Sequence, residues 1–122
     1  MAVFLTLGYS EERDPSPARL REVLARMEVF EGEEGFGVSL TCARTVWSLY
    51  TDRTELAVWM NLNYTFHGRG QPRHMRGVIR EHMLTMWELL SKGRLDEIER
   101  EPWFPGDGHQ AEPLSGTPNL KQ

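Results

Sequence analysis

The stretch VWSLYTDRTELAVWMNL, residues 46–62, decides the fold that the sequence predicts. Two runs of apolar, aromatic and β-branched residues flank a polar segment at residues 51–55, a pattern typical of a β-hairpin. We expect the first strand within residues 38–50, with a break near Ala43, and the return strand at residues 56–64. This pairing is the strongest structural signal in the chain.

The faces of this hairpin are informative, because alternate residues of a strand point to opposite sides of a sheet. Trp47 and Tyr50 lie on opposite faces of the first strand, and Trp59 and Met60 lie on opposite faces of the second. Since both faces carry large apolar side chains, we expect the hairpin to be covered on both sides, at least partly, by a layered fold or by a partner. Trp47 and Trp59 should then be shielded from bulk water.

Further elements precede the hairpin. The apolar run at residues 2–7 predicts a buried strand, and a core strand at the start of the chain suggests an upstream segment or a partner strand. Ser16 as N-cap and Pro17 as first helical residue, followed by apolar residues at helical spacing, predict an amphipathic helix at residues 17–29. Residues 31–37 are typical of an acidic, glycine-rich loop.

The second half of the chain predicts helices and a tail. The apolar period predicts a helix at residues 73–91, weakened by Gly77 and ended at Gly93, with one or two further turns at residues 94–100. The fold class is therefore α+β: an antiparallel β-sheet with a central hairpin, two main α-helices packed on it and a disordered C-terminal tail. We expect a sheet-and-helix segment at residues 1–66, a helical segment at 67–100 and the disordered tail at 101–122.

Composition restricts the class of protein. The chain has 122 residues, of which 39% are hydrophobic and 26% charged, and a formal charge of −4, as in a single globular unit. Its basic residues are dispersed, so no nucleic-acid partner is expected. No segment approaches the ~20 apolar residues of a membrane helix, and no signal peptide is recognisable, so no membrane partner is expected. A single cysteine forms no internal disulfide, so we expect a cytoplasmic protein.

RTVWSLYTD at residues 44–52 and ELAVWMN at residues 55–61, with the helix that bears Arg19 upstream, resemble the C-terminal part of the N-terminal-nucleophile (Ntn) linear amide hydrolases. That group includes choloylglycine hydrolase and acyl-CoA:6-aminopenicillanate acyltransferase. The resemblance covers about residues 2–64. It implies two stacked antiparallel sheets between helical layers, and cleavage or transfer of a small acyl amide through a cysteine thioester. No cofactor is expected.

The residues that carry out this chemistry in the group have no counterpart here. Members use an N-terminal cysteine whose α-amino group is the base, whereas this chain begins with Met1 and Ala2. The asparagine-containing strand motif of the oxyanion site is also missing. We therefore expect the nucleophile-lacking C-terminal portion of an amide hydrolase or acyltransferase. Such a portion would be inactive alone, and its partner would be a missing N-terminal half.

Arg19 and Cys42 are the candidate catalytic residues, each with a structural alternative. Arg19 can hold a carboxylate or an oxyanion, but a solvated position on a helix is the commoner role of an arginine. Cys42 becomes a nucleophile only if cleavage after Thr41 exposes it, whereas a free cysteine in a strand usually packs in the core. No metal site is expected, since His74 and His82 are about two turns apart on the predicted helix.

Two other functions stay open. A small α+β protein-interaction or homodimerisation module would dock its partner through the helix after Pro72 and through exposed edges of the hairpin. The methionine-rich stripe of that helix serves either a partner groove or the core. A small-ligand-binding protein would form its pocket from Trp47, Trp59 and Tyr64.

Overall fold

The computed structural model describes residues 2–7, 10–27, 37–63 and 70–108, which form a seven-stranded sheet with helices packed on it. The strands lie in the order β2-β1-β3-β4-β5-β6-β7, and all neighbouring strands are antiparallel. The predicted α+β class is confirmed. The strands are β1 (Val3–Leu7), β2 (Ser10–Arg13), β3 (Gly37–Cys42), β4 (Trp47–Asp52), β5 (Ala57–Asn61), β6 (Arg73–Met75) and β7 (Phe104–Pro105).

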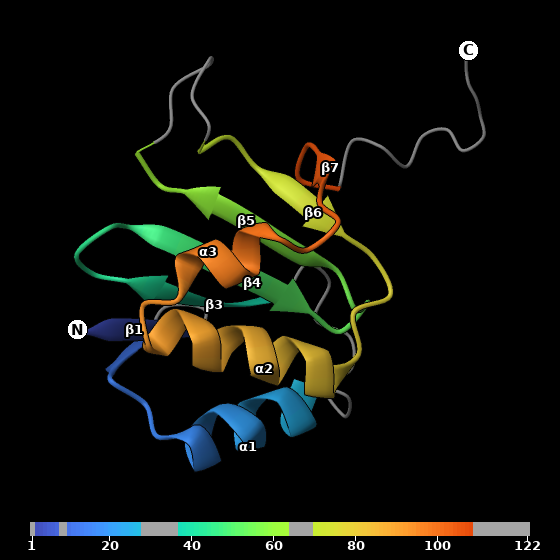
Figure 1. The fold of residues 1–122 in the computed structure, drawn as a ribbon. Helices are drawn as coiled ribbons and strands as arrows, with labels where there is room; N and C mark the ends of the chain where they lie inside the picture. The colour runs from blue at the N-terminus through green and yellow to red at the C-terminus, as the bar shows by residue number, and fades with distance from the viewer. Residues whose placement is uncertain (1, 8–9, 28–36, 64–69, 109–122) are drawn as a thin grey trace.

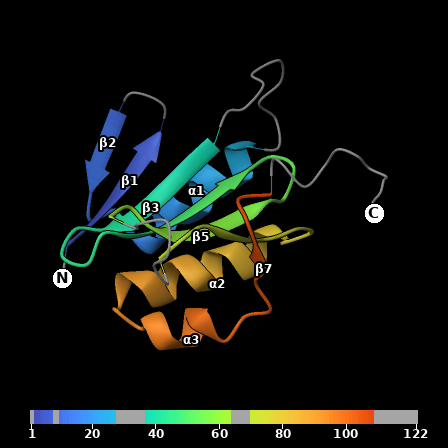
Figure 2. The same ribbon diagram turned by 90° about the horizontal axis from the view of Figure 1, so that it is seen from above.

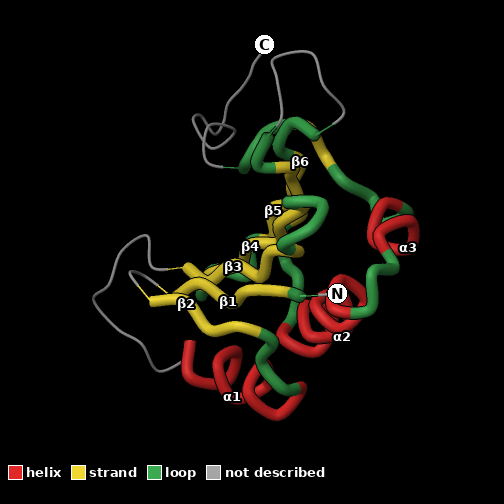
Figure 3. The backbone as a smooth tube through the Cα atoms, turned by 90° about the vertical axis from the view of Figure 1, so that its left-hand side faces the viewer, coloured by secondary structure: helices red, strands yellow, loops and turns green. Residues whose placement is uncertain are grey.

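The helices α1 (Pro17–Met27), α2 (Arg80–Ser91) and α3 (Leu95–Glu99) lie on one face of the sheet (Figure 1, Figure 2). Seen end-on, the sheet bends between β3 and β6, and the helices follow the outer side of the bend (Figure 3). The inner side of the bend faces no helix among the described residues. We call this inner side the concave face and the outer side the helix face.

The core lies between the helix face and the helices. The register of the strands places Leu5, Leu40, Leu49 and Trp59 in one row across β1, β3, β4 and β5, and all of them are fully buried. Burial of each such side chain contributes about 1.5–3 kcal/mol, so this face stabilises the fold. The helices α1 and α2 cover the row with Leu20, Val23, Leu24, Met27, Met83, Met86, Trp87 and Leu90.

The predicted hairpin is confirmed as the pair β4–β5, with Trp47 opposite Asn61 at its open end. The break predicted near Ala43 is a full turn, in which Val46 has a φ of 55°. Residues 38–50 therefore form parts of two strands, β3 and β4, that pair with each other.

The predicted first helix and first strand are also confirmed. The helix α1 begins at Pro17, and Ser16 Oγ accepts a hydrogen bond from the backbone N–H of Arg19 at 3.1 Å, as an N-cap should. The strand β1 pairs with β3 on one side and with β2 on the other. The sequence does not predict β2, because an exposed edge strand made only of polar residues has no buried face to mark it.

The second helix begins later than predicted. It starts at Arg80, and the residues assigned to its first turns form the strand β6, Arg73–Met75, beside β5. Gly77 has a φ of 71°, in the left-handed region, so a right-handed helix cannot run through it. The helix ends as predicted, since Gly93 has a φ of 76° after its last turn, and the further turns are α3.

The segments predicted along the chain contribute strands to one sheet. Because β6 extends the sheet beside β5, the segments 1–66 and 67–100 share one sheet. Residues 101–108 of the predicted tail are described and include β7, in which Pro105 pairs with Arg73 at the edge of the sheet. The rest of the tail and most of the predicted loop at residues 31–37 lie outside the described residues. None of the described helices has the length and apolar character to cross a membrane.

The hairpin is covered fully on one side and only partly on the other. Trp59 is fully buried on the helix face and Trp47 is partly buried, as predicted. On the concave face, the described residues supply neither a helix nor a second sheet (Figure 3). Val58 and Ser48 are nevertheless buried on that face, and Tyr50 and Met60 are partly buried, so the expected cover, at least partial on both sides, is observed. The two stacked sheets implied by the Ntn resemblance are replaced by a single bent sheet over the described residues.

Candidate functional site

The tryptophans predicted to line a ligand pocket form a stacked row on the helix face. The rings of Trp47 and Trp59 lie 4.6 Å apart at an interplanar angle of 18°, and Trp103 continues the row 6.4 Å from Trp59. Trp59 donates its indole N–H to Glu99 of α3 at 2.9 Å. Since Trp59 is fully buried, it offers no surface to a ligand. Tyr64, the third predicted pocket residue, lies outside the described residues.

An ion pair between Arg73 and Glu99 closes the end of this row. Nη1 and Nη2 of Arg73 donate to the two carboxylate oxygens of Glu99 at 2.9 and 2.8 Å. A pocket of about 370 Å³ lies beside the pair and Trp103. The pair joins β6 to α3, and its charges neutralise each other, so we assign it a structural role.

Arg19, predicted as a candidate anion-binding residue, joins α1 to β2. Its Nε and Nη2 donate to the carboxylate of Glu12 at 2.9 and 2.5 Å, and its Nη1 donates to Glu22 at 3.0 Å. The bonds to Glu12 and Glu22 raise the pKa of Arg19, and the bonds from Arg19 lower the pKa of Glu12. The hydrogen bonds of Arg19 with Glu12 and Glu22 therefore explain the position of its side chain without a bound substrate.

Cys42, the candidate nucleophile, ends β3 on the helix face, opposite Val3, and is fully buried. Burial raises the pKa of the Cys42 thiol, but hydrogen bonds with Thr45 and with the backbone at Arg44 outweigh this effect, so the pKa lies below its ordinary value. A thiol without solvent access cannot attack a substrate, whatever its pKa. Core packing, the alternative role, accounts for its position.

The histidines of the described structure tie the C-terminal segment to the sheet and to α2. His74 Nδ1 lies 3.0 Å from the carbonyl oxygen of Gly106, and His82 Nε2 lies 3.0 Å from the carboxylate of Glu101. Over residues 2–7, 10–27, 37–63 and 70–108, no three histidine, cysteine, aspartate or glutamate side chains gather at a metal-binding distance.

The chain itself covers the methionine stripe of the second helix and the edges of the hairpin, two of the predicted interaction surfaces. In α2 the methionines of the apolar stripe, Met83 and Met86, are fully buried in the core. Both strands of the hairpin have neighbours on each side, since β3 pairs with β4 and β6 pairs with β5. A docking surface has to be sought elsewhere on the molecule.

The concave face carries two rows of side chains across the sheet. The first row contains Thr6, Ser39, Tyr50 and Val58, and the second contains Phe4, Thr41, Ser48 and Met60. We call these residues the trough. None of them bears a charge, although 26% of the chain is charged. Charged side chains lie beside these rows on the same face: Asp52 ends β4 and is buried, and Arg13 of β2 lies over the Phe4 ring, 6.0 Å from its centroid. Glu11 of β2 lies opposite Thr6.

Two hydroxyl donors of the trough, those of Thr41 and Tyr50, have acceptors within the sheet. Thr41 Oγ1 donates to Ser48 Oγ at 3.0 Å, and the Tyr50 hydroxyl donates to Asp52 at 3.1 Å. Burial and the neighbouring Asp52 carboxylate raise the pKa of Tyr50, so its hydroxyl stays protonated at neutral pH. The Tyr50 ring lies directly on the backbone of Gly37, where a Cβ atom would be 2.2 Å from the ring. This floor is therefore packed and hydrogen-bonded by its own residues.

The strand β7 and residues 106–108 close the β6 end of the trough. His74, in line with Val58 on the same face, holds Gly106 through its hydrogen bond, and a Cβ atom on Gly108 would lie 3.2 Å from the His74 ring. Phe104 contacts His74 with a ring distance of 6.0 Å. Phe104 is nevertheless 60% exposed, so an apolar ring stands free at the rim of the trough.

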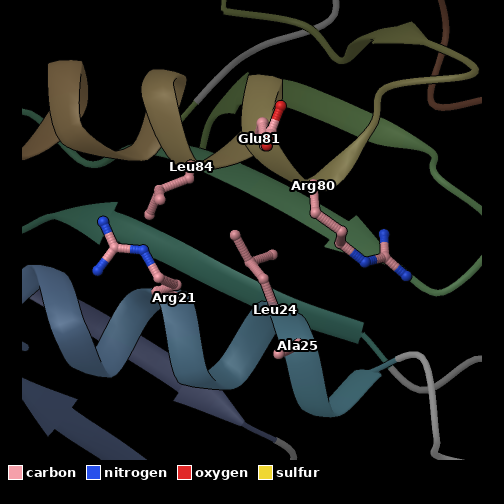
Figure 4. A pocket seen from close by; sticks show the side chains of 6 residues that line it. All are labelled: Arg21, Leu24, Ala25, Arg80, Glu81 and Leu84. Atoms are coloured by element: carbon pink, nitrogen blue, oxygen red, sulfur yellow. The ribbon is translucent and has the colours of Figure 1, made fainter.

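A seam between α1 and α2 is a further surface feature (Figure 4). Its pocket of about 320 Å³ is lined by Leu24, Ala25 and Leu84, with Arg21 and Arg80 at opposite ends. Arg80 also reaches the backbone carbonyl of Asp52 at 3.5 Å. The seam follows the line along which the two helices pack, and nothing in the structure indicates an occupant.

Comparisons with protein-family models, with curated proteins and with solved structures found no match to this chain.

The trough is the surface that the sequence analysis missed. A signal for it exists in β3, where buried Val38 and Leu40 alternate with partly exposed Ser39 and Thr41. Such alternation is typical of a sheet with one covered and one open face.

Proposed function

We propose that this chain is a protein-interaction module, and that the trough is its docking surface for a second folded protein layer. The observation that carries the proposal is the concave face of β1, β3, β4 and β5, which no described helix covers and whose eight trough side chains bear no charge (Figure 3). A sheet face of this kind is normally buried against another layer of structure.

The composition of the trough supports this proposal. The centre of a protein interface is depleted of charge and enriched in aromatic residues and methionine, whereas its rim is polar. Phe4, Tyr50 and Met60 supply the large side chains of the trough, and all three are partly exposed. Glu11 and Arg13 supply a charged rim along β2. The trough thus has the distribution of residue types expected of a docking surface.

The hydrogen bonds of the trough lower the cost of covering it. A buried polar group without a partner costs about 1–3 kcal/mol. Thr41 bonds to Ser48, and Tyr50 bonds to Asp52, so these donors keep their partners when water leaves. We further propose that the module works in the cytoplasm, since Cys42 is the single cysteine of the sequence and a single cysteine forms no internal disulfide.

Thiol labelling in cells and in dilute solution tests the proposal. The variant Ser39→Cys places a reactive thiol in the trough, while native Cys42 stays buried. Ile79→Cys is the matched control, because Ile79 is 53% exposed just before α2 and outside the trough. We expect a maleimide to label Ser39→Cys readily in dilute purified protein but slowly in cells, and to label Ile79→Cys in both. Equal labelling of Ser39→Cys in both conditions would contradict a docking role.

The Ntn amide hydrolase function stays a prediction of the sequence resemblance. Its direct test is the intact mass of the protein from its native source. A longer polypeptide, or a chain cut after Thr41, is the result that this function requires. Cleavage after Thr41 would have to expose Cys42 from the core, and that would also change the stability of the sheet.

A further inference from the structure

We infer that residues 101–108, which we call the strap, are an autoinhibitory cover of the trough: they occupy its β6 end, and a docking partner displaces their last three residues. The strap follows α3, pairs with β6 through β7 at the edge of the sheet and ends over the His74 ring on the concave face (Figure 1). This inference rests on the proposed function, which makes the trough a docking surface, and adds how access to that surface is controlled.

The strap lies where the first row of the trough continues across the sheet. That row ends at Val58 of β5, and the register of β5 with β6 places His74 next in line on the same face. His74 is only 8% exposed, and a Cβ atom on Gly108 would lie 3.2 Å from its ring. A folded layer that covers the row and extends to β6 therefore has to take the place of the strap.

The first part of the strap is anchored at the helix face. Trp103 stacks on buried Trp59 with 6.4 Å between the ring centroids, and its indole N–H donates to the carbonyl oxygen of Ile98 at 2.8 Å. Glu101 lies 3.0 Å from Nε2 of His82 in α2. Aromatic packing and contacts with two helices therefore fix this part of the strap.

The last part of the strap is held mainly by hydrogen bonds of its backbone. The carbonyl oxygen of Gly106 lies 3.0 Å from His74 Nδ1, and the carbonyl oxygen of Gly108 accepts a hydrogen bond from Arg76. The Gly106 N–H donates to the carbonyl oxygen of Pro72 at 3.0 Å. Glycine has no side chain to bury, so the roughly 1.5–3 kcal/mol that a buried apolar side chain contributes is absent at both positions. This part should therefore open at a lower free energy than the core.

Gly106 is placed to act as the hinge between the two parts. Its φ is 88°, in the left-handed region, and glycine moves between this region and others without a Cβ clash. Rotation there lifts residues 106–108 while Trp103 stays in place. The movement uncovers His74 and frees the bond from Arg76 to the strap, so a partner's carbonyl or carboxylate oxygen can replace the two strap carbonyls.

Alanine substitutions at the two strap glycines test the inference in the full-length Ser39→Cys chain. The φ values of Gly106 and Gly108 are 88° and 86°, so both substitutions carry a similar backbone strain. Only Gly108→Ala adds a clash, because its Cβ would lie 2.7 Å from Leu56 Cδ1 and 3.2 Å from the His74 ring. A Cβ atom on Gly106 meets nothing within 4 Å, so Gly106→Ala is the matched control.

Two measurements follow the strap and the trough separately. In purified protein, hydrogen exchange at residue 106 should be several-fold faster in Gly108→Ala than in the parent Ser39→Cys chain, with the exchange of β3 and β4 unchanged. Unchanged β3 and β4 show that the variant is folded. In cells, a maleimide should label Ser39→Cys several-fold more slowly with Gly108→Ala than with Gly106→Ala, because the strap no longer competes with the partner.

The outcomes separate this inference from the proposed function. Unchanged exchange at residue 106 in Gly108→Ala would overturn the strap as a removable cover. Equal or faster labelling of Ser39→Cys with Gly108→Ala than with Gly106→Ala would overturn its competition with a partner. In both cases the docking function stands if Ser39→Cys is protected in cells. If Ser39→Cys is labelled as fast in cells as in dilute protein in every background, both the inference and the proposed function are wrong.

Discussion

Thr41 donates a hydrogen bond to Ser48 across β3 and β4, with 3.0 Å between the hydroxyl oxygens, at the centre of the trough. This bond replaces one that water would otherwise make. Because an intramolecular hydrogen bond is worth only about 0.5–1.5 kcal/mol net, its value to folding is small. The bond matters more for docking, because the Thr41 hydroxyl keeps Ser48 as its acceptor when a partner covers the sheet and excludes water.

The contact between Gly37 and Tyr50 yields a stability prediction. A Cβ atom at Gly37 would lie 2.2 Å from the Tyr50 ring, so Gly37→Ala must displace the ring. We expect a loss of about 1–3 kcal/mol in the free energy of unfolding, measured by urea denaturation. In a Tyr50→Ala background the clash is absent, and the same substitution should cost far less. An equal cost in both backgrounds would show that the ring is not the cause.

Glu99 links α3 to both Trp59 and Arg73. Glu99→Ala leaves the buried indole N–H of Trp59 without its acceptor, which should lower the free energy of unfolding by about 1–3 kcal/mol. The ion pair adds little to this, because Glu99 and Arg73 are about a third exposed. The control is Asp96→Ala in the same helix, where a side chain that is 76% exposed should cost less than about 0.5 kcal/mol. Equal effects at the two positions would refute the linking role.

The position of Cys42 yields a reactivity prediction. Because the thiol is fully buried, a thiol reagent should modify the native chain only as fast as the sheet opens. Modification in urea should be complete within the time of mixing and labelling. Rapid modification of the native protein would place Cys42 at the surface and revive it as a candidate nucleophile.

The contact between Arg19 and Glu12 yields a pH dependence. The hydrogen bonds from Arg19 lower the pKa of Glu12 below its ordinary value of 4.5. A lowered pKa in the folded state stabilises the fold at pH above that ordinary value, and this stabilisation disappears as the pH falls through the lower, folded-state pKa. The difference in stability between the native chain and Glu12→Gln should therefore be present at pH 7 and vanish in acid. In an Arg19→Gln background the same difference should be much smaller at pH 7, because the donor to Glu12 is gone.

The sequence predicts the elements of the helix face well, because their buried apolar side chains recur at the spacing of a helix or of a strand. Leu20, Val23, Leu24 and Met27 fix α1, and the hairpin follows from its tryptophans and its polar turn. The prediction fails where the same spacing of apolar residues fits both a helix and another structure. Around Gly77, apolar residues at helical spacing belong to a strand and a turn, and only the left-handed backbone of the glycine distinguishes the two.

The trough could not be predicted from the hairpin alone. Tyr50, Val58 and Met60 make its second face look like a buried one, and the sequence does not show that Tyr50 leans on Gly37 and bonds Asp52 instead of facing another layer. The short strands β2 and β7 carry no periodic signal, so the rim that they form is visible only in the structure. Arg19 and Cys42 were plausible in sequence because residue type alone does not reveal burial or ion pairing.

Maleimide labelling of Ser39→Cys in cells, alone and combined with Met60→Lys or Ile79→Lys, tests the central claim most directly. Met60 lies in the second row of the trough, and Ile79 is an exposed apolar residue outside it. We predict slow labelling of Ser39→Cys alone and in the Ile79→Lys background. We predict fast labelling in the Met60→Lys background, because the lysine would place an unpaired charge in the docking contact. Equal labelling rates in all three backgrounds would contradict docking through this face.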